Sequence, residues 1–388
     1  MTNEKIYENL CDELVEIRHY LHENPELSEA EFETTAFLTK ELEKIDVKIL
    51  PSNLTSGIIA QIGSGNPVIA LRADIDALPI LEETKLKFAS KNDGIMHACG
   101  HDLHMTSLLG AAKILKAREN ELNGTVKFIF QPAEEIGLGA KKMLETGLLD
   151  DVQAFVGYHN MPHLEAGKIV LREKGVMAAV ERFAVKITGK GSHAAYPHEG
   201  FDSVLATAAI IQNLQQIVAR NVSTFDQTVL SVTHVEAGKT WNVLPDTAFF
   251  EGTIRTFDEK TREFVKNRFV EVIENTANAY GVSAKIEWIM EAGVTYNDPN
   301  LTEILRNAAQ KWHYNIGNAE PSGAGEDFAH YRAQAPSVFA FIGSNEPGSS
   351  GLHFSDMTVR DETLPAAVDY YVNSSFVLLD YFGNSEKV

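Results

Sequence analysis

The chain has 388 residues, of which 44% are hydrophobic and 23% are charged, a composition typical of globular proteins. Its formal net charge of −20 argues against binding to nucleic acids or to anionic membrane surfaces. It contains no run of about 18 apolar residues, so we expect no membrane-spanning helix. The two cysteines indicate no disulfide framework, which fits a protein of the reducing cytoplasm.

The first half of the chain alternates predicted helices with apolar strands, which favours a mostly parallel α/β sheet. Ser28 and Glu31 form a capping-box pattern, which predicts the start of a helix that runs to about residue 44. The uninterrupted apolar run at 68–71 predicts a central strand that is buried on both faces. The other elements predicted here are helices at 4–22 and 138–147 and strands at 47–50, 57–62, 125–130 and 153–158.

The pattern changes near residue 180, where strands with alternating polar and apolar residues begin. The elements that follow are predicted in the order βαββαβ, which is the ferredoxin-like split motif of an α+β domain. After about residue 293 the α/β character returns, with a helix at 299–312, a strand at 337–343 and a helix at 362–382. We therefore predict a discontinuous domain, 1–180 and 293–388, and an inserted domain at 181–292.

Residues 94–109 gather side chains of the types that bind metal ions. They include His97, Cys99, His101, Asp102 and His104. Thiolates, imidazoles and carboxylates are the side-chain groups that hold transition metals in proteins. A helical apolar stripe follows at once, so these residues would lie in a loop at a helix N-terminus. Taken alone, the cluster fits a metal site, and it fits ordinary buried or surface residues equally well.

More residues of the ligand type follow apolar strands further along the chain. They are Glu134 and Glu135, His159, Glu326 and Asp327, and His353. In open α/β sheets, the edge at the carboxyl ends of the strands carries the binding site. The recurrence of such side chains after strands therefore favours a metal site at this edge.

Taken together, these residues resemble those of a known family, the dinuclear metal-dependent amidohydrolases. The family includes hippurate hydrolases, N-acyl-amino acid amidohydrolases, N-acetyldiaminopimelate deacetylases and plant auxin-conjugate hydrolases. The matching motifs are RADIDALP at 72–79, HACGHDLH at 97–104, FQPAEE at 130–135, HN at 159–160, GKGSHAAYP at 189–197, GEDF at 325–328 and LH at 352–353. The resemblance implies a catalytic α/β domain with an inserted lid or dimerisation domain, through which a homodimer or homotetramer would form.

The resemblance also implies two divalent metal ions per subunit, with one ligand shared between them. The ligands would be Cys99, His101, Glu135, His159 and His353, and the shared ligand would be Cys99. A thiolate and imidazoles suit zinc, while manganese, cobalt or nickel can also occupy such a site. Cys99 could instead be a nucleophile with a neighbouring histidine as its base. Metal ligation also explains the distant histidines, so we favour it.

Further residues of these motifs would support the metal ions without binding them. Asp74 and Asp102 would orient the ligand imidazoles, and Glu326 and Asp327 would support the site from behind the ligands. Asp76 fits an orienting role and a structural role equally well.

The resemblance assigns the proton transfers of the reaction to Glu134, because Glu135 beside it would bind metal. His193 would reach the site of a neighbouring subunit and stabilise the tetrahedral oxyanion. Arg255 and Asn242 would hold the α-carboxylate of the substrate, since a guanidinium group matches a carboxylate. Arg255 could equally pair with acidic neighbours on the inserted domain.

The sequence therefore predicts an enzyme that hydrolyses the amide bond of a small-molecule N-acyl-L-amino acid. The leading substrates are N-acetyl-amino acids, N-acetyldiaminopimelate and hippurate-like aromatic conjugates. A two-metal dipeptidase or aminopeptidase is one alternative, although Arg72 stands where the dipeptidase branch carries a metal-binding histidine. A catalytically inactive metal-binding homologue is another, and the presence of Glu134 argues against it.

Overall fold

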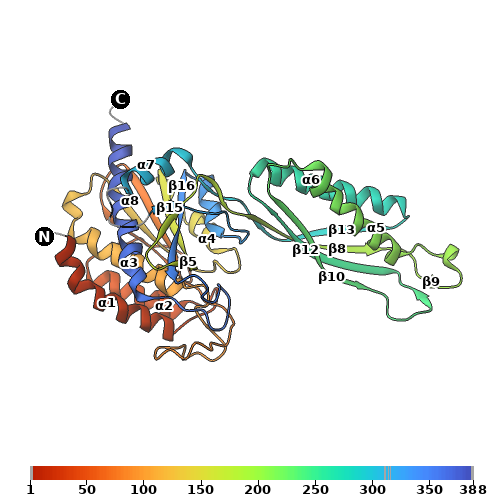
Figure 1. The fold of residues 1–388 in the computed structure, drawn as a ribbon, viewed down its shortest axis with the longest axis horizontal. Coiled ribbons are helices and arrows are strands. Elements are labelled where there is room, and N and C mark those ends of the chain that lie inside the picture. The colour runs from red at the N-terminus through yellow and green to blue at the C-terminus, as the bar shows by residue number, and fades with distance from the viewer. Residues whose placement is uncertain (1–2, 310–311, 313, 315, 386–388) are drawn as a thin grey trace. The chain divides into compact units, whose positions relative to one another are not determined.

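The structure is a computed structural model that describes residues 3–309, 312, 314 and 316–385 (Figure 1). The chain folds into two compact units. The first comprises Met1–Val176, Tyr296–Glu320 and Asp327–Val388, and the second comprises Met177–Thr295 and Pro321–Glu326. The second unit thus takes in a short segment, 321–326, that the sequence-based division assigned to the discontinuous domain. No helix in the described part of the chain is long and apolar enough to cross a membrane.

The main sheet of the first unit is a mostly parallel α/β sheet, as predicted. Its described strands are β1 (Lys48–Ile49), β2 (Ile58–Gly63), β3 (Val68–Asp74), β4 (Thr125–Gln131), β5 (Ala154–Glu165), β6 (Ile169–Leu171), β15 (Ile316–Asn318) and β16 (Ser337–Asn345). They are ordered β1-β2-β4-β3-β5-β16-β6-β15, and the central strands β4, β3, β5 and β16 run parallel to one another. Every residue of β3 is buried, as expected for a central strand covered on both faces.

Helices cover this sheet and close its core. Helices α3 (His101–Ala117) and α8 (Leu364–Ser385) pack side by side against β3, and α1 (Asn3–Glu23) packs against both of these helices (Figure 1). Leu14, Leu108 and Val368 from these helices are buried in one core with the sheet. The remaining α-helices described in this unit are α2 (Phe32–Lys44), α4 (Gly139–Glu145) and α7 (Pro299–Ala309). The predicted end of α7 at 312 includes 310 and 311, which lie outside the described residues.

The second unit has the predicted ferredoxin-like order of elements. Strands β8 (Ala179–Thr188), β10 (Thr228–Ala237), β12 (Thr247–Thr256) and β13 (Ser283–Ala292) form an antiparallel sheet of order β10-β12-β8-β13. Helix α5 (Ser203–Gln216) lies between β8 and β10 in the chain, and α6 (Glu259–Ala279) lies between β12 and β13. Burial alternates along β12, so its apolar side chains pack with those of the two helices in a separate core.

Shorter ladders complete the described sheets. In the second unit, β9 (Ser192–His193) pairs with β11 (Val243–Leu244). The strands β7 (Lys174–Met177) and β14 (Thr295–Asn297) form the other two-stranded ladder.

The start of α2 differs from its prediction. Glu31 precedes the helix, but its side chain makes no capping hydrogen bond. The carboxylate of Glu26 instead accepts the backbone N–H groups of Glu33 and Thr34 at 3.1 and 2.8 Å. The capping box predicted from Ser28 and Glu31 is therefore wrong. Because Glu26 satisfies these helix donors, the carboxylate of Glu31 is available for a contact elsewhere.

Candidate metal centre

The predicted metal ligands come from four segments of the first unit. Cys99 lies in the loop before α3, and His101 is the first residue of that helix. Glu135 lies in the turn after β4, and His353 lies in the loop that follows β16. His159 lies within β5, which was predicted to end at 158. The strand is longer because it continues to pair with β16 as far as Glu165.

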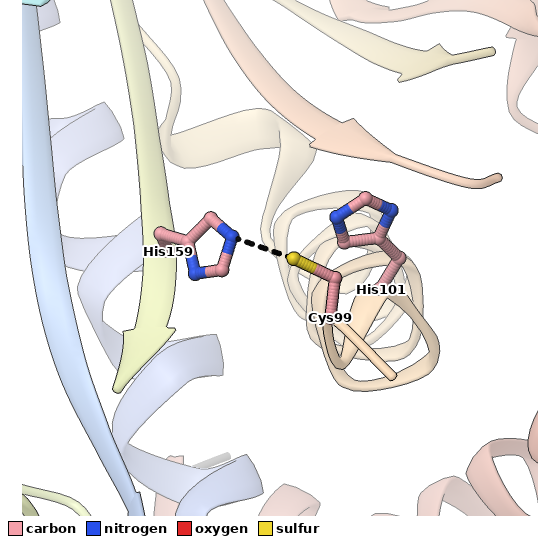
Figure 2. A group of neighbouring side chains, drawn as sticks. All are labelled: Cys99, His101 and His159. Atoms are coloured by element: carbon pink, nitrogen blue, oxygen red, sulfur yellow. Dashed lines mark hydrogen bonds between the residues drawn. The ribbon is translucent and has the colours of Figure 1, made fainter. Parts of the chain in front are cut away.

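Cys99 belongs to two groups of side chains that could each hold a metal ion. One group is Cys99, His101 and His159, and the other is Cys99, Glu135 and His353; within each group the ligand atoms lie within 4.8 Å of one another. The sulfur of Cys99 lies 3.3 Å from Nε2 of His159 and 3.4 Å from Nε2 of His353. Figure 2 shows this sulfur pointing toward His159, with His101 beside it at the start of α3. The structure thus brings all five predicted ligands together, with Cys99 in the shared position.

The residues of this cluster fit divalent metal ions. Among the described residues, Nε2 of His101 and Oε1 of Glu135 are buried without a hydrogen-bond partner, and they lie 3.9 Å apart. A buried polar atom without a partner costs about 1–3 kcal/mol, so these two atoms favour a bound ion. Nδ1 of His101 and Nδ1 of His159 bond to the backbone oxygens of Asp76 and Asn160 at 2.8 and 2.7 Å. These bonds leave Nε2 of each ring for a metal.

The surroundings of the ligands shift their pKa values in different directions. Burial, with Glu135 nearby, raises the pKa of the Cys99 thiol well above its usual range. Burial alone would lower the pKa of His101, but the carboxylates of Asp74, Asp76 and Glu135 together outweigh burial, so that the pKa rises to about 10. Burial lowers the pKa of His159 to about 3. At neutral pH a metal ion must therefore displace protons from Cys99 and His101, and a thiol with a raised pKa is a poor nucleophile.

Arg72 lies fully buried in β3, two residues before the strand ends, and holds two of the predicted supporting carboxylates. Its guanidinium group donates to Asp74 at 2.6 Å, to Asp327 at 2.8 Å and to the side-chain oxygen of Gln131 at 2.9 Å. The backbone N–H of Ala140 also donates to Asp327, at 2.9 Å. Asp74 and Asp327 thus share one buried cation.

The sequence placed His104 among the metal-binding residue types without giving it a role of its own, and the structure shows that it links Asp74 to the strand that carries His159. Its Nδ1 bonds to Asp74 at 2.5 Å, and its Nε2 accepts the backbone N–H of Asn160 at 2.9 Å. The Asn160 side chain in turn donates to the backbone oxygen of Cys99 at 2.5 Å. Gly100 permits this contact, because its φ is +79° and a Cβ there would lie 2.4 Å from the Asn160 amide nitrogen. The sequence does contain one signal for this role: His104 follows the predicted ligand His101 by three residues, which places both on one side of the helix.

Asp102 differs from its predicted role of orienting a ligand imidazole. Its carboxylate accepts from Arg18 at 2.9 Å and bonds to Nδ1 of His22 at 3.1 Å. Arg18 also donates to Asp361 at 2.5 Å, and His22 lies 3.3 Å from Glu82. Successive helical residues point about 100° apart, so Asp102 faces α1 and braces the first turn of α3 against it.

Four further predicted site residues lie in the second unit: His193, Asn242, Arg255 and Glu326. His193 is exposed on β9 and pairs with Val243, and the backbone oxygen of Asn242 accepts an N–H from the same loop, so the structure brings these two segments together. Arg255 lies on β12, where burial lowers its pKa and the nearby Glu181 opposes that shift. Glu326 is buried. The substrate-binding and catalytic roles of these residues stay predictions.

The family model of peptidase family M20/M25/M40 matches residues 70–375. The chain belongs to this family. It is 46% identical over 365 residues to the N-acetyl-L-cysteine deacetylase of Bacillus subtilis, a match that covers 94% of this chain and 87% of that protein. It is 39% identical to the IAA-amino acid hydrolase ILR1-like 4 of Arabidopsis thaliana, over 92% of this chain and 85% of that protein.

A solved structure of the M20 family also matches the whole fold. The Bacillus subtilis YXEP protein, a dinuclear metal-binding peptidase, superposes with a TM-score of 0.86 at 41% identity, covering 96% of this chain and 99% of that one. The family resemblance inferred from the motifs is thereby confirmed. The two overlapping ligand groups around Cys99 agree with a centre for two divalent ions.

We expect the metal affinity of this cluster to rise steeply with pH. Because Cys99 and His101 hold protons at neutral pH, binding of Zn²⁺ should release about two protons, and the apparent affinity should rise about a hundredfold per pH unit near neutrality. Competition with a chromophoric chelator at constant ionic strength measures this slope. An affinity that does not change with pH would contradict these protonation states.

We expect Arg72→Met to destabilise the first unit by about 3–5 kcal/mol, because it leaves Asp74 and Asp327 buried without their cation. Urea unfolding followed by circular dichroism measures the loss. Arg182→Met is the control, since Arg182 forms an exposed ion pair with Glu251 and its loss should cost about 1 kcal/mol or less. Equal losses in the two variants would contradict the importance of the buried cation.

Proposed function

We propose that this protein is a metal-dependent amidohydrolase that splits N-acyl-L-amino acids into a carboxylic acid and a free amino acid. The observation that carries the proposal is a pair of adjacent carboxylates, Glu134 and Glu135, on one turn beside thiol and imidazole donors. Glu135 groups with Cys99 and His353, and oxygens of both glutamates lie within 4.8 Å of a nitrogen of His101. In metal-assisted amide hydrolysis, such a pair divides the work, because one carboxylate can bind metal while the other moves protons.

In this proposal Glu134 performs both proton transfers. When bound, the two divalent ions supply Lewis acidity, which acidifies water and polarises the amide carbonyl. Glu134 accepts the proton of the attacking water and then donates it to the nitrogen of the departing amino acid. A C–O bond forms and the C–N bond breaks, and Glu134 returns to its initial ionised form.

Zinc and manganese are the metals that we infer for this centre, with cobalt and nickel as further possibilities. The thiol and the three imidazoles favour zinc, because these softer donors suit it. The carboxylate of Glu135 is a harder donor that also accepts manganese.

We assign the substrate to the class of acylated amino acids. The relatives support this class, since one is an N-acetyl-L-cysteine deacetylase and another is an IAA-amino acid hydrolase. The leading candidates are N-acetyl-amino acids, N-acetyldiaminopimelate and hippurate-like conjugates. Arg72 weighs against a dipeptidase, because a guanidinium group cannot replace the histidine ligand of that branch.

The inserted domain has a substrate-facing role in this proposal. Residues 1–180 and 293–388 supply the metal centre, and residues 181–292 act as lid and dimerisation domain. His193 from a neighbouring subunit stabilises the oxyanion, which requires a homodimer or homotetramer. Arg255 and Asn242 hold the α-carboxylate of the substrate. We place the enzyme in the cytoplasm, acting on small molecules.

We expect Glu134→Gln to lower kcat by about 10²–10⁴-fold while the protein keeps its metal, because the change removes only the proton transfers. The assay follows release of free amino acid from N-acetyl-amino acids, N-benzoyl-amino acids and N-acetyldiaminopimelate, with dipeptides in parallel. Protein whose metal has been removed with a chelator is reloaded with Zn²⁺, Mn²⁺, Co²⁺ or Ni²⁺ in turn, and elemental analysis counts the bound ions.

Glu145→Gln on α4 is the matched control and should keep wild-type activity. Full activity of Glu134→Gln would contradict the assigned base. Hydrolysis of dipeptides without hydrolysis of the acylated substrates would replace the proposal with a peptidase.

A further inference from the structure

The turn that carries Glu134 and Glu135 contains a strained backbone residue. Ala133 has a φ of 54°, in the left-handed region that costs a non-glycine residue about 1–2 kcal/mol. Its backbone oxygen accepts the N–H groups of Leu138 and Gly139 at 3.2 and 3.1 Å, which closes the turn. Since Ala133 immediately precedes Glu134, its backbone conformation sets the direction in which that side chain leaves the turn.

A buried carboxylate from the start of α2 holds this residue. One oxygen of Glu31 accepts the N–H of Ala133 at 2.8 Å, and the other accepts the hydroxyl of Ser56 at 2.8 Å. The side chain is fully buried, and burial raises its pKa. Burying such a group is costly, and the two hydrogen bonds offset only part of that cost. Helix α2 does not need the carboxylate, because Glu26 already caps its first turn.

A second buried carboxylate holds the other side of Glu134. Asp76 accepts the N–H of Glu135 at 3.0 Å and the hydroxyl of Ser28 at 2.7 Å. The N–H groups on both sides of Glu134 are therefore anchored by carboxylates, and residues 28–31 contribute to both anchors. The side chain of Glu31 makes its contact directly, whereas Ser28 acts through Asp76.

We propose that Glu31 is a positioning residue for the reaction. By holding the N–H of Ala133, it fixes the turn so that Glu134 and Glu135 reach the metal centre together. The inference rests on the proposed function, in which one of these carboxylates moves protons and the other binds metal. Without the acceptor, the N–H of Ala133 is left buried and unpaired, and the turn relaxes toward ordinary backbone angles. A shift of about 1 Å in a catalytic group is enough to cost about 10²-fold in rate.

Glu31→Met and Glu31→Gln form a matched pair of similar length and without charge, of which only glutamine keeps an oxygen that can accept from Ala133. We expect Glu31→Met to lower kcat at least about tenfold, with KM changed by less than about twofold. Its affinity for Zn²⁺, from chelator competition, should also fall, because Glu135 shares the turn. Glu31→Gln should restore kcat and Zn²⁺ affinity to within about threefold of wild type.

Glu26→Ala is the control for a purely structural role. It removes the cap of the same helix, so it should lower the melting temperature while leaving kcat and Zn²⁺ affinity unchanged. Wild-type kcat in Glu31→Met, or equal losses in the methionine and glutamine variants, would overturn the proposal. If Glu31→Met does not fold, Ser56→Ala tests how the Glu31 carboxylate is held, because it removes the hydroxyl bonded to the other carboxylate oxygen. A lower kcat at constant KM would support the proposal, and a wild-type kcat would overturn it.

The Zn²⁺ measurement separates this inference from the proposed function. If the wild-type protein hydrolyses no substrate of the panel, the proposed function fails. A difference in Zn²⁺ affinity between Glu31→Met and Glu31→Gln would then still support the positioning of the turn by Glu31. Equal Zn²⁺ affinities in the two variants would overturn the positioning role as well.

Discussion

The sulfur of Cys99 is the point at which the two halves of the metal centre meet. Glu135, His159 and His353 from distant parts of the chain converge on it, and His101 lies two residues away; together they form two groups that share only Cys99. Its position is set by the loop before α3, which Gly100 allows to approach β5 closely enough for Asn160 to bond to the backbone of Cys99. The parallel sheet matters because its central strands deliver the ligand segments to this loop.

Around the ligands, the fold buries carboxylates and gives each one its own donors. Asp74 and Asp327 share the guanidinium group of Arg72, whereas Asp76 and Glu31 accept backbone N–H groups from the turn after β4. Each of these contacts offsets part of a desolvation cost that would otherwise favour the protonated acid. The same contacts hold the ligands in place, so the energetics of the core and the geometry of the site depend on the same residues.

The sequence was most informative where chemistry is local or is repeated at strand ends. The ligand types in residues 97–104 and the adjacent pair Glu134 and Glu135 could be identified from residue type and spacing, and the alternation of strands and helices indicated the sheet. The partners of buried side chains could not be identified in this way. Glu31 lies 102 residues from Ala133, and its local pattern indicated a helix cap, because a capping box and a distant contact use the same residue types.

Asp102 and His104 illustrate the same limit on α3, which begins at His101, whereas the sequence predicted that these residues lie in a loop before the helix. Both lie in the motif that contains Cys99 and His101. Only the three-dimensional position of each side chain shows whether it binds a metal ion or holds a neighbouring residue in place. Asp102 turns toward Arg18 on α1, and His104 turns toward Asp74 on β3. The directions follow from the helical turn once the packing of α3 is known, and the packing is a property of the whole fold.

Anomalous diffraction from crystals of the Zn²⁺-loaded protein would test the shared position of Cys99 most directly. We expect two zinc peaks in each subunit, both at a bonding distance of about 2.3 Å from the Cys99 sulfur. One peak would have His101 and His159 as its other ligands, and the second would have Glu135 and His353. A single peak, or two peaks of which only one is bonded to this sulfur, would contradict the account.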